Sequence, residues 1–187
     1  MVISTNDMRP GQAIIFEGRI CLIAEYERVK PGKGPTFVRA KLKDVNTGQV
    51  LDKTWRGEQK VELAILQPRP HQYIYRQGDL YHFMDTETFD QIALGRDEVP
   101  DEIARFLKEN MEVQVTFHNQ KALKVEIPSF VELKVTTTSP GLRGDTVSGA
   151  SKPATLESGA VIQVPLFVNE GDVVKVDTRT GTYVTRA

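Results

Sequence analysis

The sequence has one cysteine, Cys21, among 187 residues. This excludes an intramolecular disulfide, and a metal site built from thiolates is not expected. No apolar run approaches the ~20 residues that a membrane-spanning helix needs, and Met1–Asp7 lacks the apolar core of a signal peptide. We therefore expect a soluble, cytoplasmic protein with no membrane partner.

Familiar catalytic motifs are also missing. The sequence contains no Walker A motif, no dinucleotide fingerprint and no nucleophile elbow. Its three histidines, His71, His82 and His118, do not have the spacing of metal ligands or of a catalytic triad. Asp85 and Asp177 lie in strand-like segments, where acids more often cap turns or pair across strands than form a catalytic pair. We expect no enzyme, no cofactor and no metal.

Short apolar runs between turn residues predict an all-β chain of three small barrels. Fourteen glycines and ten prolines are scattered as turn signals. Residues 1–65 contain five such runs with little helical period, which predicts a small SH3-like barrel. The runs are 13–16, 20–24, 37–42, 50–51 and 61–66.

Residues 66–128 and 129–187 predict two further barrels of the OB type. The first has four strand-like segments, the second of which is long enough for two strands, and one helix that begins near Pro100 with Ile103, Phe106 and Leu107 on one face. Five strands with a helix before the fourth is the OB order. Residues 176–183 echo residues 84–89, and this weak repeat predicts a second OB-like barrel.

Lys33 stands at the centre of a near-palindromic segment, Pro31-Gly32-Lys33-Gly34-Pro35. Prolines fix φ near −65° and glycines allow positive φ, so the segment predicts a sharp tip on which only the lysine side chain has reach. The alternative is a solvated hairpin loop whose lysine only keeps it soluble.

The residues around this tip are basic. Between positions 28 and 60 there are nine cations and three acids, a net charge of +6 in a chain whose overall charge is −1. By module the charges are +3 for residues 1–64, −4 for 65–128 and 0 for 129–187. This predicts an RNA-facing end, the alternative being chance variation on a solvated surface. The candidate RNA-binding cations are Arg28, Lys30, Arg39, Lys41 and Lys43.

A second candidate site is the glycine-rich connection 138–153, which carries Arg143, Asp145, Thr146 and Lys152. Long ordered loops on barrels often bind ligands, and OB-folds bind oligonucleotides through such loops. The alternative is a flexible connector.

Four motifs make the chain resemble bacterial elongation factor P over nearly its whole length. They are PGKG at 31–34, YHFMDTETFDQ at 81–91, PGLRGDTVSG at 140–149 and KPATLESGAVIQVPLFVNEG at 152–171. The resemblance implies a KOW/SH3-like domain followed by two OB domains in an L-shaped, tRNA-like arrangement. It also implies a monomer that enters the ribosome between the P and E sites and relieves stalling at consecutive prolines.

The resemblance further implies roles for single residues. Lys33 would reach the CCA end of the P-site peptidyl-tRNA, and Gly144, Asp145 and Thr146 would lie near the mRNA codon in the E site. Tyr183 and Arg186 would contact the small subunit and the tRNA anticodon arm. Family members often carry a modified residue at the tip, so a lysine-modifying enzyme is a further partner.

The glycine-proline ending of the loop, Gly34-Pro35, resembles a subgroup in which unmodified lysine suffices because Pro35 stiffens the loop. Three alternatives remain open. One is a paralogue with a different stalling preference. Hypusine-bearing archaeal and eukaryotic relatives are a second, although they lack a third domain like residues 129–187. The third is a general single-strand-binding OB protein, for which Trp55 is the one candidate stacking residue on the basic surface.

Overall fold

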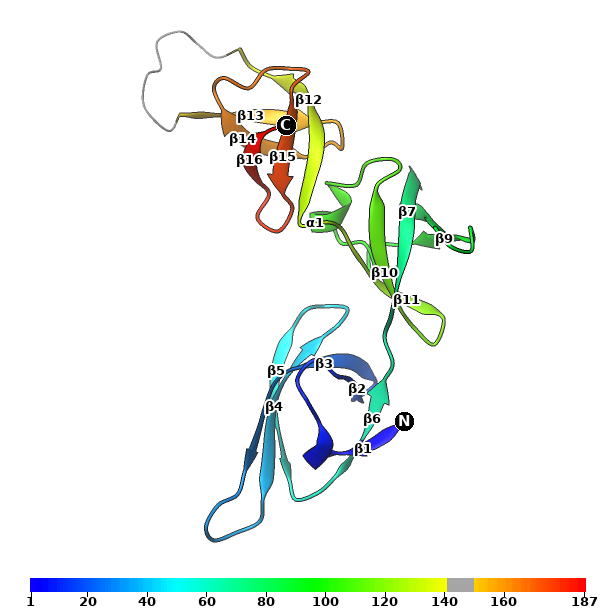
Figure 1. The fold of residues 1–187 in the computed structure, drawn as a ribbon, viewed down its shortest axis with the longest axis vertical. Helices are drawn as coiled ribbons and strands as arrows, with labels where there is room; N and C mark the ends of the chain where they lie inside the picture. Colours follow the sequence, from blue (N-terminus) through cyan, green and yellow to red (C-terminus); the bar gives the residue numbers. More distant parts are fainter. Residues whose placement is uncertain (141–149) are drawn as a thin grey trace. The chain divides into compact units, whose positions relative to one another are not determined.

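Strands dominate the computed structural model, which describes residues 1–140 and 150–187 (Figure 1). Three barrel-like sheets of six, five and five strands follow one another along the chain. The expectation of an all-β chain of three small barrels is confirmed. Within the described residues, no helix is long and apolar enough to cross a membrane.

The first sheet has the strand order β1-β6-β2-β3-β4-β5. Its strands are β1 (Val2–Ser4), β2 (Ala13–Phe16), β3 (Arg19–Val29), β4 (Phe37–Asp44), β5 (Val50–Arg56) and β6 (Lys60–Ala64). Alternate residues of β4 are buried, as expected for a half-buried strand. The core includes Ile14, Ile23, Val38 and Leu42, all fully buried. The three-residue β1 was not predicted, because it carries too few apolar residues to make a pattern.

Strands β3 and β4 continue as a long ribbon up to the pair Val29–Phe37. The register shifts between Ile23 and Glu25, which marks a β-bulge. A bulge reverses which side chains face the core, so the residues of β3 beyond it alternate in the opposite sense. The ribbon thus carries residues 30–36 at its end.

The second sheet has the order β11-β10-β7-β8-β9. Its elements are β7 (Gln67–Gln77), β8 (Leu80–Asp85), β9 (Gln91–Leu94), α1 (Asp101–Ala104), β10 (Glu112–His118) and β11 (Lys121–Glu126). The helix lies before the fourth strand of this sheet, as predicted. It is shorter than predicted, because beyond Ala104 the chain continues in bonds three residues apart, such as Phe106 N to Ile103 O. Phe106 and Leu107 are buried from this turn rather than from a helix face.

The third sheet has the order β14-β13-β12-β15-β16. Its strands are β12 (Phe130–Thr138), β13 (Ser151–Leu156), β14 (Val161–Pro165), β15 (Val173–Asp177) and β16 (Thr182–Arg186). Strands β13 and β14 were not predicted, and the connection expected to reach position 153 ends before Ser151. Its core contains Leu133, Leu156 and Val174, and Phe106 joins the same cluster from the end of α1.

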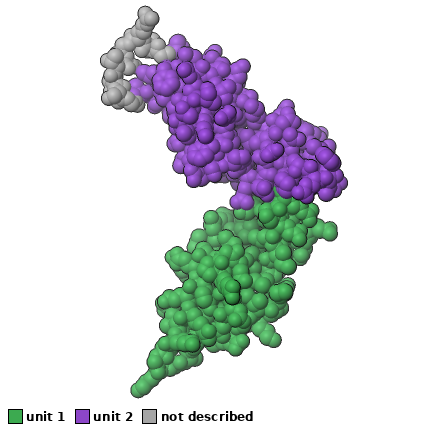
Figure 2. Space-filling view, viewed as in Figure 1, with its two compact units in different colours: residues 1–69, 116–124 green, residues 70–115, 125–187 purple. Residues whose placement is uncertain are grey.

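The chain forms two compact units (Figure 2). One contains residues 1–69 and 116–124, and the other contains residues 70–115 and 125–187. The tip of the β10–β11 hairpin belongs to the first unit, where His118 Nδ1 lies 3.1 Å from Ile65 O. Domain boundaries near positions 65 and 128 stay a prediction.

The same five-residue turn occurs once in each sheet, at Asp44–Gly48, Asp85–Phe89 and Asp177–Gly181. In each, an aspartate Oδ1 accepts the backbone N–H of the residue two positions on, at 2.8, 2.8 and 3.0 Å. The fifth residue donates its N–H to the aspartate carbonyl at 2.8–2.9 Å. The predicted echo between the second and third modules includes this turn, and the first sheet carries it too.

Candidate nucleic-acid interface

The side chain of Lys33 is exposed at the end of the β3–β4 ribbon. Gly34 has φ of +122°, which other residues adopt only with strain. A Cβ at Gly34 would lie 3.7 Å from the ring of Pro31, so the two sides of the tip are close together. The loop therefore presents one ammonium group at a narrow end.

The base of this loop is fixed by a neighbouring turn. Gly57, which follows β5, donates its N–H to Thr36 O at 2.9 Å and has φ of +68°. The guanidinium of Arg39 lies 5.1 Å from the centre of the Phe37 ring, within cation–π range. The residues next to the tip are thus held by three strands.

The candidate cations do not all lie on one face of the ribbon. Arg39, Lys41 and Lys43 alternate on β4 and point away from the core. Arg28 pairs with Val38, a buried residue of β4, so its side chain belongs to the opposite face. The bulge near Glu25 produces this division. Lys30 lies in the loop beyond β3.

One of these cations is paired within the protein. Lys41 Nζ lies 2.9 Å from Glu25 Oε2. The hydrogen bond to Glu25, together with its negative charge, raises the pKa of Lys41 above its usual value. Lys43 forms no ion pair with any residue in the described part of the chain. Lys43 is therefore more available to an RNA phosphate than Lys41.

Trp55 is 4% exposed and packs edge-on against Phe16, with ring centres 6.1 Å apart. A base cannot stack on a ring that the core covers. The stacking residue suggested for a general single-strand-binding protein is thus part of the core, and this weakens that alternative.

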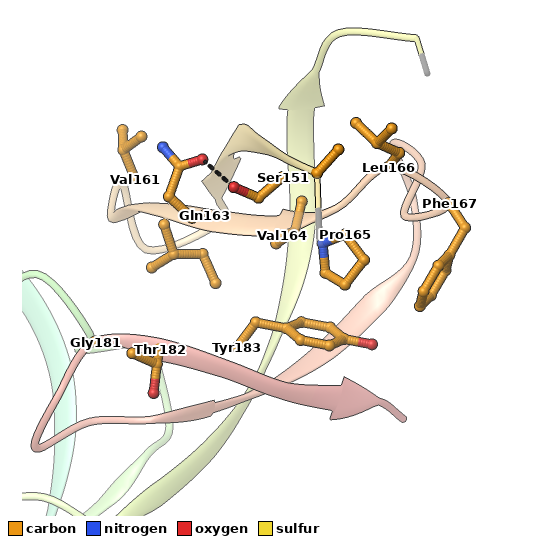
Figure 3. A pocket seen from close by; sticks show the side chains of 12 residues that line it. Ser151, Val161, Gln163, Val164, Pro165, Leu166, Phe167, Gly181, Thr182 and Tyr183 are labelled. Carbon is orange, nitrogen blue, oxygen red and sulfur yellow. Dashed lines mark hydrogen bonds between the residues drawn. The ribbon is translucent and has the colours of Figure 1, made fainter. Parts of the chain in front are cut away.

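In the third sheet, Tyr183 lines a groove of about 890 Å³ between β14 and β16. Figure 3 shows its ring next to that of Pro165, with Phe167 nearby. Sequence reasoning missed this groove because β14, which forms one wall, was not predicted. Arg186, the other predicted residue of β16, lies 3.8 Å from Asp172. Gly144, Asp145 and Thr146 lie outside the described residues.

The acids considered for chemistry have structural roles. Asp85 and Asp177 cap the repeated turns. The Arg179 guanidinium holds the pKa of Asp177 below its usual value through a side-chain hydrogen bond. No group of three potential metal ligands occurs within the ranges 1–140 and 150–187.

Taken together, a lysine-tipped ribbon on one small β-barrel, followed by two further barrels, defines a KOW-like and OB-domain class of β protein. Family models for elongation factor P match three segments: the KOW-like domain at residues 4–61, the OB domain at 66–125 and the C-terminal domain at 131–186. The chain belongs to the elongation factor P family, whose members are translation elongation factors.

Relatives align over almost the full chain. Elongation factor P of Thermoanaerobacter sp. is 52% identical over 185 residues, covering 99% of this chain and 100% of the relative. That of Natranaerobius thermophilus is 50% identical over 185 residues, covering 99% and 98%.

Two solved structures have a similar fold. Translation initiation factor 5A from Methanococcus jannaschii has a TM-score of 0.54 at 23% identity, covering 67% of this chain and 93% of that one. A protein of the same initiation-factor family from Naegleria fowleri has a TM-score of 0.55 at 15% identity, covering 68% and 98%. At these identities the likeness concerns the fold alone.

Proposed function

We propose that the protein binds the ribosome between the P and E sites and stimulates peptide bond formation at consecutive prolines. The observation that carries this proposal is the isolation of Lys33 at the end of a three-stranded support. Proline is a poor acceptor and a rigid donor, so stalling reflects lost alignment of the two tRNA ends. A single positioned cation suits a partner that needs alignment rather than new chemistry.

In this mechanism Lys33 contacts the CCA end of the peptidyl-tRNA and supplies neither acid nor base. A charge-assisted hydrogen bond contributes roughly 1.5 to 3 kcal/mol. If it forms only when the two tRNA ends are aligned, it raises the rate by about ten- to a hundredfold. The ribosome performs the reaction, and the protein lowers the conformational entropy of the two tRNA ends that react.

The remaining site residues position the protein on RNA. Arg39 and Lys43 bind phosphates on one face of the ribbon, and Arg28 binds on the other, which suits a ribbon inserted between two RNA segments. Lys30 extends this charge to the loop. Lys41 contributes less because Glu25 neutralises it.

The third domain adds two contacts to this proposal. Gly144, Asp145 and Thr146 lie near the E-site codon of the mRNA. Tyr183 and Arg186 contact the small subunit and the anticodon arm of the P-site tRNA. The half-buried ring of Tyr183, at the edge of an apolar groove, supports a packing contact there.

We propose that unmodified Lys33 is sufficient for stall rescue. In this proposal Pro35 orders the loop, which in other members of the family is the effect of a modifying enzyme. The protein acts in the cytoplasm as a monomer, without a cofactor. A family member with a different stalling preference is the alternative, and reporters with several stalling motifs separate the two.

The proposal is tested by translation of a Pro-Pro-Pro reporter in a reconstituted system with unmodified protein. The wild type should restore synthesis, and Lys33→Ala should lose at least tenfold of that gain. Lys60→Ala is the matched control, because it removes an exposed cation of the same sheet that is not among the proposed RNA contacts. Equal rescue by the Lys33 variant contradicts the proposal.

If the unmodified wild type fails, protein from the native source is compared next. Rescue together with added mass on Lys33 would show that modification is required. Failure of the native protein as well would overturn the assignment to stalled ribosomes.

A further inference from the structure

The turn Asp85–Phe89 differs from its two counterparts at its fifth position. That position has φ of +71° at Gly48, +69° at Gly181 and +63° at Phe89. Glycine adopts this left-handed conformation freely, whereas a bulky side chain is strained there. The protein therefore keeps a phenylalanine where its own two equivalent turns have glycine.

Folding does not account for this phenylalanine. Its side chain is 69% exposed, so the ring adds little to the core. The bonds that hold the turn do not involve the Phe89 side chain: the Phe89 N–H donates to Asp85 O at 2.9 Å, and Thr86 N and Oγ1 each donate to Pro70 O at 3.2 Å. These bonds would also form with glycine at position 89. An exposed aromatic side chain on a hydrogen-bonded turn is the kind of residue that anchors a protein interface.

The charges around Phe89 indicate which kind of partner it binds. Residues 84–92 contain three carboxylates and no cation, and Glu87 and Asp90 beside the ring are exposed. Pro70, at the base of the turn, also lines a groove with Glu112, which is exposed. This surface repels phosphate and attracts lysine and arginine. It is thus opposite in charge to the ribbon of the first sheet.

We infer that the Phe89 turn is a docking site for a positively charged protein surface on the ribosome. The ring packs against the aliphatic parts of lysine or arginine side chains, whose charged ends meet Glu87 and Asp90. The inference rests on the proposed ribosome binding. It assigns the second domain a protein partner, in contrast to the RNA partner proposed for the first.

Phe89→Gly separates docking from folding, because glycine relieves the backbone strain at positive φ and removes the aromatic ring. We expect its melting temperature to equal or exceed that of the wild type. Its dissociation constant for ribosomes with an occupied P site should rise about tenfold, the effect of losing an anchor residue. Phe89→Tyr should bind like the wild type. Leu80→Ala, an exposed apolar residue at the opposite end of β8, is the control and should also bind normally.

The identity of the partner is tested with a photo-reactive phenylalanine analogue at position 89 of the full chain, bound to the same ribosomes. A cross-link to a lysine- and arginine-rich segment of a ribosomal protein supports the inference. Cross-linking to ribosomal RNA, or binding by Phe89→Gly within twofold of wild type, overturns it. Absence of ribosome binding by the wild type would instead overturn the proposed function, and this docking site with it.

Discussion

Lys41 Nζ and Glu25 Oε2 lie 2.9 Å apart on neighbouring strands, on the ribbon face that also carries Arg39 and Lys43. Glu25 thus neutralises one cation, Lys41, on the surface proposed to bind RNA. The two groups are exposed, so their pairing matters more for binding than for stability.

Glu25→Gln should release the Lys41 ammonium and strengthen ribosome binding, whereas Lys43→Ala should weaken it. Each phosphate-binding cation changes the salt slope by about 1, so the slope should become steeper in the first variant and shallower in the second. The measurement is the dissociation constant over a range of salt concentrations. Glu62→Gln, an acid on β6, controls for net charge and should have a smaller effect.

Gly57→Ala should impair stall rescue more than its effect on stability explains. A non-glycine residue at φ of +68° costs about 1 kcal/mol, and the strain falls on the turn that bonds Thr36. Gly48→Ala is a matched control, since Gly48 has φ of +71° in the same sheet. Thermal unfolding should show similar losses for the two variants. Equal rescue by both would show that the Gly57 turn does not position the loop.

Pro35→Ala should lower rescue by unmodified protein while lowering the melting temperature only slightly. Replacing proline adds conformational freedom of about 0.4–1 kcal/mol, which corresponds to about a two- to fivefold loss of rate. Pro35 is exposed, so the core is unaffected. Single-turnover dipeptide formation measures the loss, and an unchanged rate would mean that Pro35 does not order the tip.

Glu157→Gln should destabilise the second compact unit at neutral pH and less so in acid. Burial alone would raise the pKa of Glu157, but the Lys134 N–H and the Lys108 ammonium outweigh it and lower the pKa. Because the folded-state pKa is the lower one, this stabilisation is complete above the ordinary glutamate pKa near 4.3. It is lost as pH falls through the folded-state value.

We expect a loss of about 0.5–1 kcal/mol at pH 7, since both side chains are partly exposed. Thermal unfolding between pH 3 and pH 7 measures it, with Glu109→Gln as the control for removing an acid. A difference that stays constant over this range would contradict the role of the carboxylate.

The local sequence was sufficient to predict the strands whose buried and exposed side chains alternate, and the sharp tip at Lys33. Proline and glycine restrict the backbone over a few residues, so their effect is readable without knowing the fold. The aspartate turns were predictable for the same reason, because the Asp85 side chain accepts the N–H groups of residues two and three positions away.

Which face of the β3–β4 ribbon each cation lies on was not predictable in this way. Simple alternation from Ile23 places Arg28 on the same side as Arg39, and the bulge before Glu25 reverses this. A bulge depends on how a strand pairs with its neighbour, which the sequence of one strand does not specify. Strand β13 was missed because Pro153 lies within it, and proline usually argues against a strand.

Phe106 completes the hydrophobic core of the sheet that begins at Phe130. If recombination joined this sheet to another protein at position 128, the sheet would lack one of its largest buried side chains. The C-terminal sheet therefore cannot be exchanged between proteins as an independent unit. It must stay together with a turn encoded more than twenty codons upstream of its first strand.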